Sequence, residues 1–245
     1  MMTALRHLSC VIAGLALLST AAWAEMFGPI AGTVYRNGGA KLVLIVHGDS
    51  GAGYISDFAA DVARANPTAT VIQMARPGYI LNGERSKGSN SGLRDHHTRT
   101  NNKLLAEGFS AASQKYPHDE LIAVGHSGGG NQIGSIVGTD PSLIDTAIMF
   151  SVPYDIQRWR NLRGSPWPKS QSPVRYLKSV SPNTKLIAAT GSEDSNTLPT
   201  FAKDYVKKAK AKGLNATYIE LPGGNHGFRT IQDQALELVN REIRN

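Results

Sequence analysis

The chain has 245 residues, with 26 Lys plus Arg, 19 Asp plus Glu, 41% hydrophobic residues and one cysteine. The modest share of charged residues excludes a disordered tail, and a single cysteine excludes an internal disulfide and a thiolate zinc site. The length favours one domain with a large core. The net charge of +7 does not indicate a nucleic-acid partner, because no helix-turn-helix or aromatic-interleaved basic motif accompanies it.

The first 24 residues have the three parts of a secretory signal peptide. Met1 to His7 carries a positive charge, Leu8 to Leu18 is mostly apolar, and an A-x-A cleavage site ends at Ala24. We therefore expect a signal peptide over residues 1–24, a single domain over residues 25–245, and a secreted or periplasmic location. The alternative is an uncleaved anchor helix, for which the apolar run is short. No later window is apolar enough to span a membrane, so we expect no stable membrane span after cleavage.

Six short runs of apolar or β-branched residues recur along the rest of the chain. Nearly continuous runs of this kind are typical of strands that are buried on both faces of a parallel sheet. The expected strands are Lys41–Val46, Ala69–Met74, Leu121–Val124, Ala147–Phe150, Lys185–Ala189 and Ala216–Leu221.

Segments with helical spacing lie between these runs. They are Tyr54–Asn66, His97–Tyr116, Ser127–Val137, Phe201–Lys212 and Thr230–Arg244. The alternation predicts an α/β fold with a doubly wound, mostly parallel sheet and helices on both faces. Two stretches interrupt it: residues 76–95 form a loop rich in Gly, Ser and Asn, and residues 152–182 are rich in proline. We expect the second stretch to be a small insertion or lid.

The segment Gly125–Gly129 reads G-H-S-G-G and fits the pattern G-x-S-x-G. It follows an expected strand and precedes an expected helix, which is the context that a nucleophilic serine requires. A sharp turn there exposes the Ser127 hydroxyl, and the N–H groups of the following helix face developing negative charge. The alternative is an ordinary glycine-rich loop that begins a helix.

With this motif in place, the chain resembles an α/β-hydrolase over nearly all of residues 34–244, with a core like those of the dienelactone hydrolases and prolyl oligopeptidases. The resemblance implies a catalytic histidine after the last strand, where His226 lies, and an acid after the preceding strand. Asp194 matches the position of the acid. Glu193 and Asp155 are the alternatives, because Glu193 is adjacent and some members of the fold place the acid where Asp155 lies.

The resemblance also implies an oxyanion hole built from two backbone N–H groups. One belongs to Gly128, and the second comes from the loop His47–Gly53, where Asp49 is favoured over Ser50. Arg76 follows another strand, in a loop that bends over the active site in this family. It is either a structural ion-pair residue or a substrate contact.

Other residues are candidates for a metal site or for contacts with a substrate. Asp95, His96 and His97 adjoin one another, but neighbours on a helix do not face one ligand point and no H-E-x-x-H motif occurs, so we expect no catalytic metal. The absence of a Walker A or dinucleotide motif favours no cofactor. Tyr79, Trp159 and Trp167 are the candidate substrate contacts.

The sequence thus predicts a secreted serine hydrolase that cleaves small-molecule or polymeric carboxylic esters through an acyl-enzyme. Two alternatives stay open: a peptidase or amidase with the same triad, and a binding protein on an inactive hydrolase scaffold. Oligomeric state is not indicated.

Overall fold

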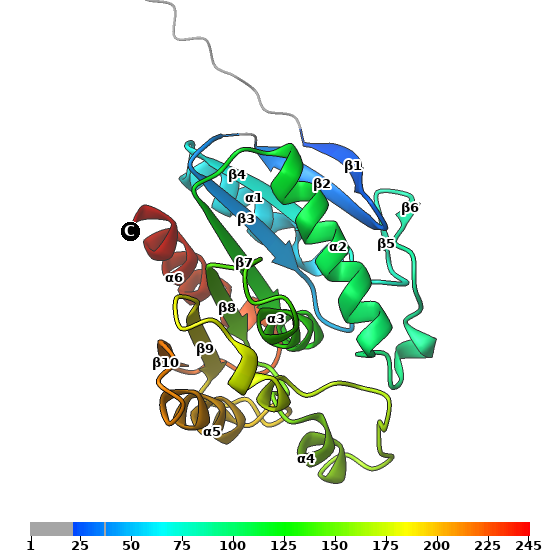
Figure 1. Cartoon of the computed structure of the whole chain (residues 1–245), viewed down its shortest axis with the longest axis vertical. Helices are drawn as coiled ribbons and strands as arrows, with labels where there is room; N and C mark the ends of the chain where they lie inside the picture. Colours follow the sequence, from blue (N-terminus) through cyan, green and yellow to red (C-terminus); the bar gives the residue numbers. More distant parts are fainter. Residues whose placement is uncertain (1–21, 37) are drawn as a thin grey trace, which may run out of the picture.

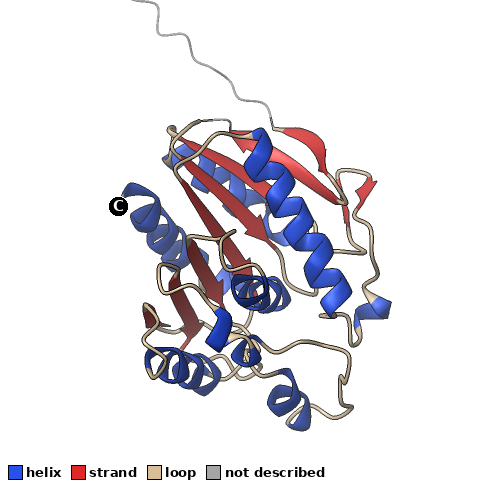
Figure 2. Ribbon diagram, viewed as in Figure 1, coloured by secondary structure: helices blue, strands red, loops and turns tan. Residues whose placement is uncertain are grey.

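A sheet forms the centre of the molecule (Figure 2). It has eight strands in the order β1-β2-β4-β3-β7-β8-β9-β10. The computed structural model describes residues 22–36 and 38–245. β2 is antiparallel to both of its neighbours, and all later pairs are parallel. The strands are β1 (Trp23–Phe27), β2 (Ile30–Arg36), β3 (Lys41–Val46), β4 (Ala69–Met74), β7 (Glu120–His126), β8 (Thr146–Phe150), β9 (Lys185–Gly191) and β10 (Ala216–Leu221), with a separate hairpin of β5 (Ile80–Leu81) and β6 (Glu84–Arg85).

Helices cover both faces of the sheet (Figure 1). α2, α3 and α5 pack on one face, and α1 and α6 pack on the other. The helices are α1 (Ser56–Ala65), α2 (Arg99–Lys115), α3 (Gly128–Thr139), α4 (Ile156–Asn161), α5 (Pro199–Lys210) and α6 (Gln232–Arg244).

The strand β3 shows why this sequence forms a sheet with two covered faces. Leu42, Leu44 and Val46 pack toward α2 and α3, whereas Val43 and Ile45 pack toward α1 and α6. Successive side chains of a strand point to opposite faces, so only a strand that is apolar at every position can serve both cores. The predicted fold class is confirmed.

All six predicted strands are present, and three have the predicted bounds. The pair β1 and β2 was not predicted, since a strand that reads Ile-Ala-Gly-Thr-Val lacks a dense apolar run. Residues 1–21 of the predicted signal peptide lie outside the described residues. The described part begins at Ala22, and the expected cleavage point after Ala24 falls inside β1. No helix of residues 22–36 and 38–245 combines the length and apolarity needed to cross a membrane.

The insertion at residues 152–182 packs against the hydrophobic core. Tyr154, Trp159 and Trp167 are each at most 8% exposed and belong to the apolar cluster on the face of α3 and α5. His97 accepts from Gln171 N–H at 2.8 Å through its carbonyl, and its N–H donates to Ser170 Oγ at 3.2 Å. The segment therefore packs against the loop that precedes α2.

Candidate active site

Ser127 lies in the turn between β7 and α3, with φ 51° and ψ −115°. A non-glycine residue adopts this region only when its surroundings enforce it. Close packing enforces it here, because a Cβ on Gly129 would lie 2.5 Å from the carbonyl oxygen of His47 and one on Gly125 would lie 2.6 Å from the nitrogen of Gly130. The glycines of the motif thus allow the turn that exposes the Ser127 side chain.

A hydrogen-bonded relay joins the serine to a buried carboxylate. Ser127 Oγ lies 3.2 Å from His226 Nε2, and His226 Nδ1 lies 3.0 Å from Asp194 Oδ2. Because the carboxylate only accepts, the proton of the neutral ring is on Nδ1, and Nε2 is free to accept from the serine hydroxyl.

Several donors hold the Asp194 carboxylate in place. Oδ1 accepts from the N–H groups of Asn196 and Thr197 at 2.8 Å each, and Oδ2 accepts from the Thr197 hydroxyl at 2.8 Å. Burial raises the pKa of Asp194, but the hydrogen bonds from His226 and Thr197 outweigh burial and lower this pKa below its usual value. The carboxyl group therefore stays ionised beside the imidazole.

The structure places the two alternative acids elsewhere. Glu193 is exposed to solvent, and its N–H donates to the carbonyl of Gly224. Asp155 caps the N-terminus of α4, where its side chain accepts from the N–H of Arg158 at 3.2 Å. Within the described residues, Asp194 is the carboxylate that the fold brings to His226.

Two backbone N–H groups are available near Ser127. Gly128 begins α3, so its N–H lies in the first turn and has no acceptor within the helix. The N–H of Asp49 finds no hydrogen-bond acceptor within residues 22–36 and 38–245, and Asp49 lines the cavity that contains Ser127. A developing oxyanion requires unpaired donors of this kind.

The ring of His47 sets the direction of the Gly48–Asp49 peptide. His47 Nε2 accepts from the N–H of Arg76 at 3.0 Å, so the ring proton is on Nδ1, which donates to the carbonyl of Gly48 at 2.6 Å. The C=O and N–H of a trans peptide point in opposite directions. The Asp49 N–H therefore points away from His47. Burial, followed by the charge of Arg76, lowers the pKa of His47 to about 3, so the ring stays neutral.

A second histidine bridges two loops of the site. His126 Nε2 lies 3.1 Å from the carbonyl of His226, and His126 Nδ1 lies 2.7 Å from the hydroxyl of Tyr54, which accepts from the N–H of Gly48 at 2.5 Å. Each proton position follows: His126 donates from Nε2, and Tyr54 donates to Nδ1. The sequence did not reveal this bridge, because its residues are 72 and 100 positions apart.

A cavity of about 440 Å³ opens beside Ser127. It is lined by Gly48, Asp49, Ser50, Tyr54, His126, Ser127, Trp159, Asn196, His226, Gly227, Phe228 and Arg229. Of the candidate substrate contacts, Trp159 lines this cavity, whereas Tyr79 and Trp167 do not. Tyr79 instead donates from its hydroxyl to the carbonyl of Asp49 at 3.1 Å, and Trp167 stacks on His97.

Asp49, His96 and His97 form a group whose potential ligand atoms lie within 4.8 Å of one another. The sequence led us to expect that His96 and His97 could not face one ligand point, because we placed them on a helix. That expectation was wrong, since both residues precede α2, which begins at Arg99. Arg76 Nη1 lies 2.5 Å from Asp49 Oδ1, so a guanidinium stands beside the carboxylate that a metal would need. Of the two roles considered for Arg76, the structure shows the ion pair.

The sequence of residues 104–244 matches the model of the prolyl oligopeptidase family. The chain belongs to this family. The match covers more than half of the chain, including α3, the loop of Asp194 and the loop of His226, and the resemblance to α/β-hydrolases is confirmed. No curated protein matches the chain by sequence. Family and fold together identify a serine hydrolase of the α/β type.

Three solved structures illustrate the fold that this family member shares. Est1E from Butyrivibrio proteoclasticus with bound ferulic acid is 15% identical, with a TM-score of 0.69 over 91% of this chain and 98% of that one. The Pyrococcus furiosus esterase Pf2001 is 15% identical, with a TM-score of 0.71 over 93% of this chain and 92% of that one. A puromycin-hydrolyzing peptidase from Mycobacterium tuberculosis is 15% identical, with a TM-score of 0.69 over 91% of this chain but 38% of that one.

Proposed function

We propose that the chain cleaves carboxylic esters through an acyl-enzyme, with Ser127 as nucleophile, His226 as base and Asp194 as the acid that orients the histidine. The observation that carries the proposal is the unbroken relay from Ser127 Oγ through His226 to Asp194, with distances of 3.2 and 3.0 Å, at the wall of a cavity. His226 takes the serine proton as the hydroxyl attacks the ester carbonyl and later returns it to the leaving alcohol. The N–H groups of Gly128 and Asp49 bind the oxyanion.

One similarity and one chemical argument favour esters over peptides. The esterases Est1E and Pf2001 match nearly over their full lengths, whereas the peptidase extends far beyond the matched part. An alcohol also leaves more readily than an amine, so the relay alone suffices for esters. Trp159 in the cavity wall gives an apolar surface for an acyl or aromatic group.

The second candidate is a peptidase or amidase activity with the same triad. The family description and the puromycin-hydrolyzing peptidase among the structural neighbours favour it. Mechanistically, the two activities differ in the leaving group that His226 must protonate. Matched substrates with one acyl group and either a 4-nitrophenol or a 4-nitroaniline leaving group separate them directly.

The first experiment combines this pair of substrates with fluorophosphonate labelling. We expect one adduct per chain, on Ser127, and hydrolysis of the ester well above that of the anilide. Ser127→Ala should lose the adduct and on the order of 10⁴-fold or more of the activity. Comparable rates on the two substrates would favour the amidase. Folded wild-type protein without an adduct would contradict the activated serine and leave the inactive binding scaffold as the explanation.

A further inference from the structure

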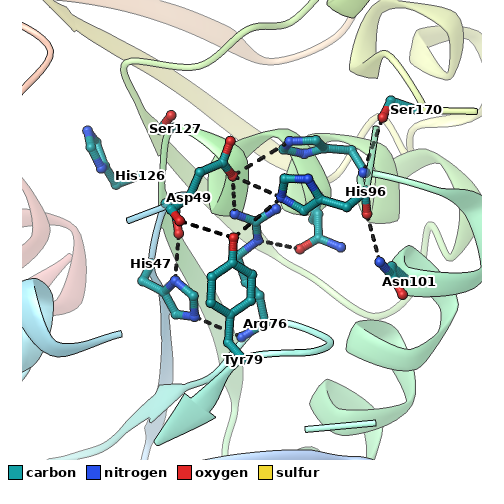
Figure 3. Close-up of polar contacts among 12 residues, drawn as sticks. His47, Asp49, Arg76, Tyr79, His96, Asn101, His126, Ser127 and Ser170 are labelled. Atoms are coloured by element: carbon teal, nitrogen blue, oxygen red, sulfur yellow. Dashed lines mark hydrogen bonds and ion pairs between the residues drawn. The ribbon is translucent and has the colours of Figure 1, made fainter. Parts of the chain in front are cut away.

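The carboxylate of Asp49 is the hub of a polar cluster behind the cavity (Figure 3). Oδ1 lies 2.5 Å from Arg76 Nη1, 3.2 Å from His96 Nε2 and 3.7 Å from His97 Nε2. Arg76 and both histidines are 1% exposed. Burying a charge without a partner is costly, so the buried guanidinium of Arg76 requires the carboxylate of Asp49, whose side chain is 29% exposed.

The cluster is itself fixed by neighbouring elements. Arg76 Nε donates to Gln132 Oε1 of α3 at 2.7 Å, and the carbonyl of His96 accepts from Asn101 of α2 at 2.7 Å. Trp167 of the insertion stacks on His97, with the ring centroids 5.6 Å apart. The helices α2 and α3 and the insertion therefore fix the side chains that surround the Asp49 carboxylate.

The arginine takes the position that a metal ion would need. Its guanidinium contacts the same oxygen that faces both histidines, and its Nε also donates to Gln132. A second cation there would share one carboxylate with Arg76 and be repelled by it. Burial raises the pKa of Asp49, but the charge of Arg76, with smaller contributions from His97 and His96, outweighs burial and holds this pKa well below its usual range, so the ion pair persists.

Both residues with available N–H groups touch this hub. The first donor is the backbone N–H of Asp49 itself, so its carboxylate and its N–H belong to one residue. The hydroxyl of Tyr79 donates to the backbone carbonyl of Asp49. A Cβ on Gly128 would lie 2.3 Å from Asp49 Oδ1 and 2.4 Å from Arg76 Nη1. The hub thus packs directly against the backbone of Gly128. Moving the carboxylate would loosen the first donor, which His47 also orients, and would remove the support behind the second.

We propose that the Asp49 side chain is a positioning group, anchored by Arg76 and His96 and flanked by His97, that fixes the two N–H donors of the oxyanion hole. This inference rests on the proposed serine hydrolase function. Asp49 contributes to the reaction through its backbone N–H, and its carboxylate acts on the reacting atoms only through that N–H and through Gly128.

The test is Asp49→Asn, which keeps the backbone N–H and the shape of the side chain but removes its charge. Loss of one oxyanion donor lowers kcat about 10²- to 10³-fold, so a misplaced donor should lower kcat by about 10- to 100-fold. We expect KM to change less than about twofold. The inhibition constant of an aryl boronic acid, which forms a tetrahedral adduct, should rise in parallel with the loss in kcat. The matched control is Asp61→Asn, which breaks an exposed Asp–Arg pair on α1.

Asp49→Asn leaves Arg76 buried without its partner, so a second variant guards against misfolding. Asp49→Asn combined with Arg76→Gln removes both charges and should fold, yet kcat should remain low. Wild-type kcat in either folded variant would overturn the proposal. So would stoichiometric zinc retained by the wild type, with activity lost to a chelator, because that would make the cluster a metal site. A wild type that no fluorophosphonate labels would instead contradict the proposed function itself.

Discussion

Tyr54 and His126 show how single residues can define proton positions across the site. The chain of hydrogen bonds from Gly48 N–H through Tyr54 and His126 to the carbonyl of His226 has one consistent set of donors. Burial, followed by the charge of His226, lowers the pKa of His126 to about 3, so this arrangement does not change at neutral pH. The loop before α1 and the loop of the base are joined by one imidazole.

Tyr54→Phe should therefore impair catalysis more than folding. The change leaves Gly48 N–H without its acceptor and His126 Nδ1 without its donor, which frees the ring to change tautomer. We expect kcat to fall about tenfold, equivalent to about 1.4 kcal/mol, and the ¹⁵N shifts of His126 to show loss of the single Nε2–H form. Tyr35→Phe is the control, since that hydroxyl donates to Gln73 away from Ser127. Equal kcat for the two variants would argue against the bridge.

The sequence predicted the relay better than its surroundings, for a physical reason. Ser127, Asp194 and His226 each follow an apolar strand in chain order, and the carboxyl ends of parallel strands meet at one edge of a sheet. The Asp49 cluster depends instead on how loops cross above that edge. No local pattern indicates that Arg76 and His97 will face the same carboxylate.

At the scale of elements, strands buried on both faces were predictable and the N-terminal pair was not. β3 and β4 have the predicted bounds, since their residues satisfy two cores at once. β10 also has the predicted bounds, although it is an edge strand whose Thr217 and Glu220 are exposed. β1 has one buried residue, Phe27, while Trp23 and Met26 are 40% and 41% exposed. A strand of this kind is specified by its pairing with β2 and leaves little periodic signal in the sequence.

The burial pattern of β1 predicts the cost of the expected cleavage after Ala24. Removal of Trp23 and Ala24 leaves three pairs with β2, including Phe27 opposite Ile30. The free energies of unfolding of chains that begin at Ala22 and at Glu25 should differ by less than the cost of truncating Phe27, because Trp23 and Ala24 are exposed residues of an edge strand. Phe27→Ala should cost about 3–5 kcal/mol. Urea titrations measure all three, and a large loss for the chain that begins at Glu25 would argue against that cleavage point.

At the scale of the whole molecule, several neutral histidines are buried together. His47, His97 and His126 are at most 6% exposed, and burial lowers their pKa values to about 3, 4 and 3. The unfolded chain binds protons on these rings below about pH 6.5, whereas the folded chain does not. Because the unfolded state then carries more protons, stability rises with pH in this window and falls as the pH drops from 6.5 toward 4.

The expected loss is up to about 1.4 kcal/mol per pH unit for each of these histidines. Urea titrations at pH 7.5, 5.5 and 4.5 should show this decline. His97→Gln should reduce the slope of the free energy of unfolding against pH by about the contribution of one histidine. Replacement of the half-buried His118 by Gln is the control for the loss of an imidazole. A free energy of unfolding that is flat from pH 6.5 to 4.5 would show that these rings are protonated in the folded state.

The contacts of residues 152–182 with the core affect what happens when this segment is replaced by the corresponding segment of a related protein. Residues 152–182 supply Trp159 to the cavity wall, and the same segment supplies Trp167 and Ser170 to His97, which flanks Asp49. Replacing this segment to alter substrate preference would therefore also change the support of the N–H groups beside Ser127. Selectivity and turnover are coupled in this segment. A graft that keeps Trp167, Ser170 and Gln171 while varying residues 156–163 would separate them.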